Sequence, residues 1–274
     1  MNPISLFFTD LIVNPIVTIV AGIYHGLNLL HIPSPLGFTI IILTVVIRFI
    51  LAPITASQLK TAKKMQMITP HLNKLKDKHK NDSKQLQAAT MALYKEHGVN
   101  PAAGCLPLLI QLPVIWGLYY VLQQIVNNNP KHVVDFVNHA VYISAFKITT
   151  AWDIHFFGLP LGQTPSKLFS TLGIGVLLVP VLTAAFQFVQ SKMMAPVSVP
   201  GQKEEKKEAD FATAFQTQSL FILPLMIGFF SWTLPVGLSF YWNTFTIFGI
   251  IQQYMIQGWG GLEEWIEKIS PNTK

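Results

Sequence analysis

Long uncharged, apolar stretches dominate the pattern along the chain. Asp10 is the only formal charge before residue 48, and residues 211–262 carry none. A hydrocarbon core of about 30 Å requires about 20 apolar residues per helix. The pattern therefore predicts an all-α membrane protein with five transmembrane helices, at residues 36–54, 105–126, 168–190, 219–234 and 236–257. Pro235 and Gly237 indicate a tight turn between the last two of them.

Residues 4–31 are apolar as well, but their polar positions are not scattered. At 100° per residue these positions fall within about 40° of one line along a helix; they are Asp10, Asn14, Thr18, His25 and Asn28. Such a stripe favours an interfacial amphipathic helix on the outer face, within residues 1–35. A transmembrane helix whose stripe packs against protein is the alternative. A signal peptide is not expected, because no basic segment precedes the apolar run.

Residues 57–98 predict a cytoplasmic helical hairpin of two amphipathic arms. Ser83 is the expected N-cap of the second arm, and Pro70 predicts a break in the first. From residue 58 to 98 there are nine lysines and three acidic residues, a net charge of +6. Because lysine and arginine accumulate in short cytoplasmic loops, this charge places the hairpin inside and the amino terminus outside. Residues 191–216 are then a cytoplasmic loop, and residues 259–274 a short cytoplasmic tail.

Four neighbouring residues of the first arm, Lys63, Lys64, Met65 and Met67, are candidates for contact with anionic lipids, a client or a partner protein. A self-packed hairpin with solvated lysines is the simpler alternative, and composition alone favours it. Aromatic residues do not alternate with these basic residues, so we expect no specific nucleic acid as a partner.

Composition supports the membrane interpretation and excludes several other classes. Hydrophobic residues make up 51% of the 274 residues and charged residues 12%, about half of the roughly 25% usual in soluble domains. The mean hydropathy is +0.43. The single cysteine, Cys105, rules out internal disulfides. The eight histidines show no metal-ligand spacing, and the common hydrolase motifs are missing, so we expect no enzyme, no catalytic residue, no metal and no cofactor.

Arg48 is the only charge inside a predicted span. An arginine at the centre of a membrane helix costs about 2.5–3.5 kcal/mol, so we expect it to face a protein interior or a water-filled cavity. Thr44, one turn earlier, lies on the same face. Snorkelling of the arginine to the inner headgroups is the alternative. A positive cavity without an acidic counter-ion favours a polar or acidic polypeptide segment as its guest, and an anion channel or carrier is the alternative function.

Two further features bear on the fold and its relatives. Gly173 and Gly175 fall inside the third predicted span, where we expect them to allow close helix packing.

The sequence LYKEHGVNP at 93–101, followed by GCLPLLIQLP at 104–113, resembles the junction motif of the YidC/Oxa/Alb membrane-protein insertase family. Residues 44–55, 64–70 and 235–253 resemble other segments of that family, so the likeness covers about residues 36–258 in order.

The resemblance implies a bacterial plasma-membrane insertase that inserts and helps to fold membrane proteins, alone or with the Sec translocon. It is similar to the short form of the family, without a large periplasmic domain. It also implies five core helices around a hydrophilic groove, lined by Arg48, Thr44, Gln190 and the aromatic residue Trp242 or Tyr241. The implied partners are nascent membrane proteins, with the Sec translocon and the ribosome as further candidates. A long basic carboxyl tail is missing, so ribosome tethering by a tail is not expected.

Overall fold

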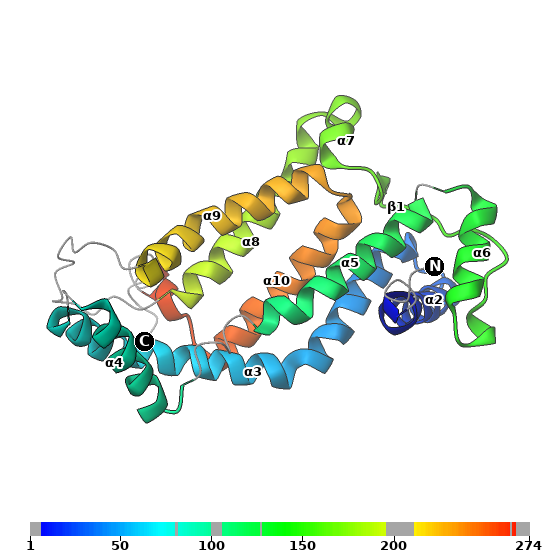
Figure 1. The fold of residues 1–274 in the computed structure, drawn as a ribbon. Coiled ribbons are helices and arrows are strands. Elements are labelled where there is room, and N and C mark those ends of the chain that lie inside the picture. Colours follow the sequence, from blue (N-terminus) through cyan, green and yellow to red (C-terminus); the bar gives the residue numbers. More distant parts are fainter. Residues whose placement is uncertain are drawn as a thin grey trace.

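The computed structural model describes residues 7–79, 82–99, 106–126, 128–195, 211–263 and 265–266. This part of the chain is mostly helical, as Figure 1 shows. Its principal helices are α2 (Asn14–Leu29), α3 (Pro35–Lys78), α4 (Ser83–Glu96), α5 (Leu106–Val126), α6 (Pro130–Ala140), α7 (Pro165–Leu172), α8 (Leu178–Met194), α9 (Phe211–Thr233) and α10 (Val236–Gln257). Short π or 3-10 turns are η1 (Thr9–Val13), η3 (Ser144–Phe146), η4 (Gly173–Leu177) and η5 (Gly260–Leu262), and β1 (His155–Phe156) pairs antiparallel with β2 (Leu159–Pro160).

Two predicted spans agree closely with the observed helices. Helix α10 begins and ends where the last span was predicted, and Pro235 separates it from α9 as the turn prediction required. Helix α5 begins at Leu106, while Cys105 lies outside the described residues. Helix α9 begins at Phe211, earlier than predicted, so residues 211–216 are helical rather than part of a loop. Ala212 and Ala214, which have the highest helix propensity, favour this extension.

The first span and the first hairpin arm are one continuous helix, which corrects the prediction of a break at Pro70. Helix α3 runs for 44 residues with Pro53 and Pro70 inside it. A proline removes one backbone donor and crowds the preceding turn, and a long helix absorbs this by bending. Figure 1 shows this bend in α3. The hairpin is therefore a direct extension of the helix that carries Arg48.

The N-cap of α4 is one residue earlier than predicted. The Asp82 carboxylate accepts hydrogen bonds from the backbone nitrogens of Lys84 and Gln85, at 3.1 and 3.0 Å. Ser83 is instead the first residue of the helix. A carboxylate caps more strongly here because its charge also interacts favourably with the positive end of the helix dipole.

The third predicted span is interrupted rather than continuous. Gly173 ends α7 with a positive φ of 69°, and five residues of 3-10 helix follow before α8 begins. A Cβ atom at Gly173 or Gly175 would meet nothing within 4 Å. These glycines therefore do not mediate close helix packing, which corrects the prediction from the sequence. Gly173 instead provides the left-handed backbone conformation that stops a helix.

Within the described residues, three stretches are long and apolar enough to cross a membrane: Thr9–Leu29, Pro35–Met65 and Pro165–Met194. A shorter apolar helix segment covers Leu220–Thr233. The number of spans thus remains a prediction.

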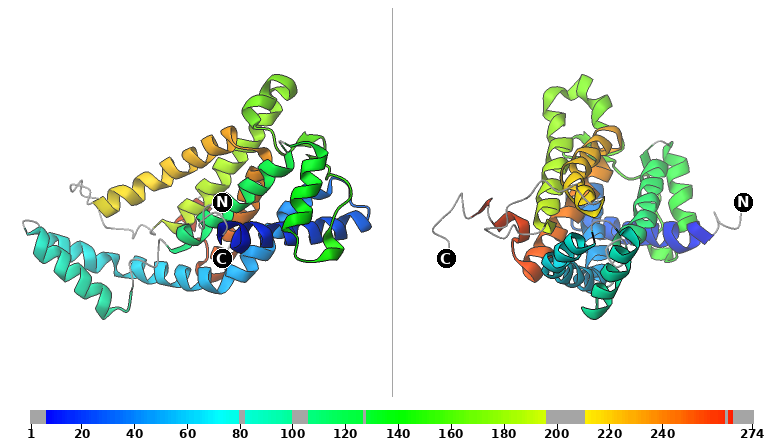
Figure 2. Two further views of the ribbon diagram at one scale, coloured as in Figure 1. Left: turned by 45° about the vertical axis from the view of Figure 1, so that its right-hand side comes forward. Right: turned by 60° about the vertical axis from the view of Figure 1, so that its left-hand side comes forward.

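Helix α10 lies at the centre of the bundle. It packs against α3 on one side and α8 on the other, and α9 packs against α8. Helices α2, α3, α5 and α6 share an apolar core with the start of α10, whose most buried members include Val17, Leu43, Leu118 and Val137. The α3–α4 hairpin and the β1–β2 hairpin lie at opposite ends of the bundle (Figures 1 and 2).

The amino-terminal helix runs across the bundle instead of along it, as Figures 1 and 2 show together. Gly117 of α5 allows close approach, because a Cβ atom there would lie 2.7 Å from Ile12 Cγ2. Part of the polar stripe predicted for the amino-terminal helix faces the loop after α6. The Tyr142 backbone nitrogen donates to the Thr18 hydroxyl at 3.2 Å, and the Tyr142 hydroxyl donates to the Asp10 carbonyl oxygen at 2.7 Å.

Gly37 provides a test of the packing between α3 and β1. A Cβ atom at Gly37 would overlap the Phe156 ring, so Gly37→Ala should lower the free energy of unfolding by about 1–3 kcal/mol through overpacking. Gly26→Ala is the matched control, because a Cβ atom there meets nothing within 4 Å and alanine favours the helix. Thermal unfolding of the two purified variants should show a lower midpoint for the first variant alone. Equal midpoints would contradict the packing described here.

Candidate functional site

Polar residues lie on the inward faces of five helices, α3, α5, α8, α9 and α10. On α10 they are Ser239, Asn243, Thr246 and Gln253, whose spacings of four, three and seven residues keep them on one face. We call the whole set, whose members are buried or half-buried, the polar seam: Thr44 and Arg48 on α3, Gln111 on α5, Thr183, Gln187 and Gln190 on α8, Ser231 on α9, and Ser239, Tyr241, Trp242, Asn243, Thr246 and Gln253 on α10.

Arg48 lies inside the protein, with 4% of its surface exposed. Its Nε atom donates to the Phe245 carbonyl oxygen at 3.0 Å, and its Nη2 atom donates to the same oxygen. The guanidinium carbon lies 3.4 Å from the centre of the Phe245 ring and 5.8 Å from that of Phe248. A desolvated cation over an aromatic face gains about 2 kcal/mol. These contacts offset a large part of the cost of keeping the charge away from water.

Gly249 makes this arrangement possible, although the hydrophobic pattern alone did not single it out. Residue 249 is four positions after Phe245, so its backbone nitrogen lies beside the Phe245 carbonyl group in a regular helix. A Cβ atom at Gly249 would overlap both Arg48 Nη2 and Gln190 Nε2. Glycine therefore leaves the carbonyl oxygen open to the guanidinium group. The available signal was a glycine close to the polar face of the last span.

The two aromatic candidates point to different neighbours. Tyr241 is 1% exposed, and its hydroxyl accepts a hydrogen bond from Gln111 Nε2 of α5. Trp242 instead donates from Nε1 to Gln187 Oε1 of α8, at 3.2 Å. Both side chains thus belong to the seam, and they connect α10 to helices on opposite sides of it.

A second cluster of hydrogen bonds connects α8, α9 and α10. The Ser231 hydroxyl lies 3.1 Å from that of Thr183 and 2.8 Å from that of Ser239. Together with Trp242 these residues border a cavity of about 20 Å³, which is enough room for one water molecule.

Thr44 and Gln190 flank Arg48 in different ways. Thr44 is fully buried, but its hydroxyl donates to the Ile40 carbonyl oxygen at 2.6 Å, so its hydrogen is used within α3. Gln190 Nε2 and Arg48 Nη2 both lie close to the position that a Cβ atom at Gly249 would take. The structure therefore brings Gln190 next to the guanidinium group.

Several buried polar atoms of α10 have no hydrogen-bond partner among the described residues. They are Asn243 Oδ1, Thr246 Oγ1 and both amide atoms of Gln253. Leaving a buried polar group unpaired costs about 1–3 kcal/mol. Polar atoms in this state require water or an incoming polar group. These atoms leave hydrogen-bonding capacity unused on the face of α10 that lies in the seam.

The predicted contact residues of the hairpin lie on the outer surface of α3. Met67 is 70% exposed, Lys63 and Lys64 are exposed, and Met65 is half-buried. The His71 and His97 rings, 5.9 Å apart, connect the two arms. Residues 100–105 of the junction motif lie outside the described residues. The first described side chain after this gap is Gln111, which is buried in the seam.

The apolar helices enclose a buried arginine and a polar seam. This arrangement defines the class of the protein: a helical membrane protein that holds polar groups away from bulk water. Residues 29–260 match the family model described as 60Kd inner membrane protein. The chain belongs to this family, the YidC/Oxa/Alb family, which confirms the resemblance drawn from the junction motif.

Three relatives illustrate the breadth of the match. The chain is 32% identical to the membrane protein insertase YidC of Fusobacterium nucleatum over 220 residues, 80% of this chain and 85% of that one. It is 30% identical to the membrane protein insertase MisCA of Bacillus subtilis over 227 residues, 81% and 70% of the two chains. It is 29% identical to the inner membrane ALBINO3-like protein 1 of Chlamydomonas reinhardtii over 263 residues, 92% of this chain. The chain spans about half the length of this algal relative.

Gly249→Ala tests the position of Arg48. The added methyl group should displace the guanidinium group from the Phe245 carbonyl oxygen and lower the free energy of unfolding by about 1–3 kcal/mol, the cost of an unpaired buried group. Gly175→Ala, at an exposed glycine with open space around it, is the control for thermal unfolding. In an Arg48→Ala background the effect of Gly249→Ala should shrink, because the clash has lost one of its partners. An unchanged effect in that background would show that the two residues are not coupled.

Proposed function

We propose that this chain is a membrane protein insertase of the bacterial plasma membrane, in which the polar seam acts as a hydrophilic groove for the translocating part of a client. The observation that carries the proposal is the buried Arg48 beside unpaired polar atoms of α10, at Asn243, Thr246 and Gln253. The names of the bacterial relatives as membrane protein insertases support it.

The groove lowers the barrier to insertion by supplying hydrogen-bond partners. Each unsatisfied backbone group in hydrocarbon costs several kcal/mol, so a polar segment cannot cross lipid on its own. Side-chain amides and hydroxyls of α8 and α10 replace water for part of that path. The client's apolar segment enters the lipid along the outside of the bundle at the same time. No nucleotide, metal or other cofactor enters this mechanism.

Arg48 attracts acidic residues of the client and keeps the groove hydrated. Neither α8 nor α10 contains an acidic residue that would neutralise it. The attraction falls with distance and is screened by salt where the groove meets water. Thr44, Gln190, Tyr241 and Trp242 shape the groove around this charge.

We further propose five transmembrane helices within a core of residues 36–258, with the amino terminus outside and the tail at 259–274 in the cytoplasm. The net charge of +6 on the hairpin supports this orientation. Residues 1–35 contain a helix that lies on the outer face, an arrangement that the crosswise path of α2 favours (Figure 2). The hairpin meets nascent clients and anionic lipids, and the Sec translocon and ribosome are further partners.

The role of Arg48 is tested by insertion of a single-span client with an acidic translocated segment into liposomes. Arg48→Ala should lower the insertion rate by about 5- to 30-fold, the change that about 1–2 kcal/mol produces. Arg48→Lys keeps the charge and should retain most of the rate, and Lys131→Gln, at an exposed lysine of α6, should retain all of it. For a client whose translocated segment is neutral, Arg48→Ala should lower the insertion rate less.

Equal insertion by the wild type and Arg48→Ala for every client would refute the proposed role of Arg48. Anion flux across the same liposomes without client insertion would instead support the channel or carrier alternative.

The hairpin proposal is tested with Lys63→Gln/Lys64→Gln and, separately, Met67→Ser. Each lysine near an anionic surface contributes about 1 kcal/mol, so the double variant should lose most of the advantage that anionic liposomes give to insertion. Met67→Ser should lower insertion in anionic and neutral liposomes alike, because it removes an exposed apolar contact. Lys147→Gln, at an exposed lysine far from the hairpin in the sequence, is the control. The same lipid dependence in the double variant and the control would contradict lipid contact by these lysines.

A further inference from the structure

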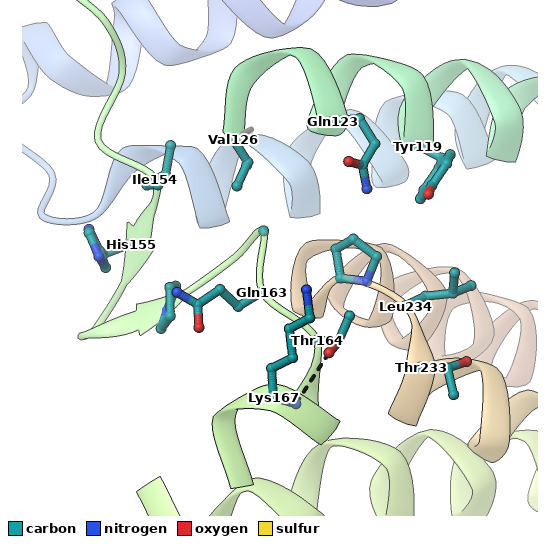
Figure 3. Close-up of a pocket in the computed structure, with 13 residues that line it drawn as sticks. Tyr119, Gln123, Val126, Ile154, His155, Gln163, Thr164, Lys167, Thr233 and Leu234 are labelled. Atoms are coloured by element: carbon teal, nitrogen blue, oxygen red, sulfur yellow. Dashed lines mark hydrogen bonds between the residues drawn. The ribbon is translucent and has the colours of Figure 1, made fainter. Parts of the chain in front are cut away.

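A cavity of about 340 Å³ lies at the end of the bundle opposite the α3–α4 hairpin. Figure 3 shows its surroundings: the last turns of α5, the β1–β2 hairpin, the start of α7, and the turn between α9 and α10. None of the groove residues named above lines it. Its volume is at the lower end of the range of small-molecule sites.

Backbone hydrogen bonds hold the walls of this cavity in place. The Gly237 nitrogen donates to the Leu161 carbonyl oxygen at 2.7 Å, and the Val236 nitrogen donates to that of Gln163 at 2.9 Å. A Cβ atom at Gly162 would overlap the Val126 side chain, so the loop after β2 packs tightly on the end of α5. The cavity is therefore formed before any ligand arrives.

The lining is cationic and polar. It contains Lys167 and His155, the side chains of Gln123, Gln163 and Thr164, and no carboxylate. Figure 3 shows the Lys167 side chain pointing into the cavity. The Asp153 carboxylate accepts from His155 Nδ1 at 2.9 Å but does not line the cavity. Lys167 is thus the group that sets the sign of the charge a ligand must carry.

The start of α7 adds one further donor. Thr164 caps this helix, accepting from the Lys167 backbone nitrogen at 3.3 Å, and Pro165 has no N–H group. The Ser166 backbone nitrogen is left to assist the lysine at the positive end of the helix dipole. Amide side chains of Gln123 and Gln163 are further donors for phosphate oxygens.

The depth of the cavity points to lipid. Helices α5 and α9 end at the cavity, and α10 begins there. Ends of apolar helices lie at the level of the lipid headgroups. Tyr119, which is 38% exposed, lines the cavity as aromatic residues do in the interfacial belts of membrane proteins. A phosphate group at this level belongs to a phospholipid.

We propose that this cavity binds a phosphate group, carried by the headgroup of an anionic phospholipid of the outer leaflet, with Lys167 as its ionic partner. The assignment to the outer leaflet rests on the orientation given under the proposed function, but the binding itself does not depend on insertase activity. Bound lipid would fix the α9–α10 turn to the β1–β2 hairpin at the membrane surface.

The test compares lipid adducts by native mass spectrometry on the whole chain in neutral detergent, with equal phosphatidylglycerol and phosphatidylcholine. All variants carry Lys63→Gln/Lys64→Gln, which removes lipid contacts of the hairpin. Lys167→Gln should lower the preference for phosphatidylglycerol about fivefold, the factor that about 1 kcal/mol per lysine corresponds to. Lys131→Gln, at an exposed lysine that does not line the cavity, should leave the preference unchanged.

Lys167→Arg should restore the preference, and thermal unfolding should show that all variants remain folded. Equal preference in Lys167→Gln and Lys131→Gln would overturn the proposal. Complete displacement of phosphatidylglycerol by millimolar inorganic phosphate would overturn the lipid assignment in favour of free phosphate. Client insertion is not part of this measurement, so a failure of the insertase proposal would leave its result unaffected.

Discussion

The hydrogen bonds from Arg48 to the Phe245 carbonyl oxygen are the interaction on which the interior depends. They place a positive charge between α3 and α10, and they require the missing side chain at Gly249. The carbonyl oxygen and the aromatic face that hold Arg48 carry no formal charge, so they leave the net charge of the site positive. A carboxylate in the same place would have neutralised the site. The positive charge of the polar seam thus depends on Arg48 having a neutral partner instead of an acidic one.

Helix α10 carries most of the polar groups that surround this charge, and its central position makes the seam continuous. Its contacts to α5 through Tyr241 and to α8 through Trp242 hold it between two walls. Its remaining polar atoms at Thr246 and Gln253 have no partner among the described residues. Such a helix is stable as a structural element and incomplete in its hydrogen bonding. This combination suits the groove role proposed for the seam.

The hydrophobic pattern predicted where helices lie along the chain better than it predicted where they are interrupted. It predicted the bounds of α10 and the burial of Arg48, because both follow from apolar length and the cost of a charge in lipid. It failed at Pro70 and Gly173, where local propensity competes with tertiary packing: α3 continues through its proline, whereas the third span stops at a glycine. Gly249 and the cavity beside Lys167 depend on contacts between distant segments, which no local pattern records.

The continuity of α3 has a mechanical consequence. Arg48 and Met67 are 19 residues apart on one helix, which at 1.5 Å per residue is about 28 Å. No loop separates them, so the exposed methionine and the guanidinium group share one continuous helical backbone. Pro53 lies between the two and is the one residue there that cannot donate a backbone hydrogen bond, so the direction of the hairpin relative to the polar seam depends on the geometry of the helix at this proline.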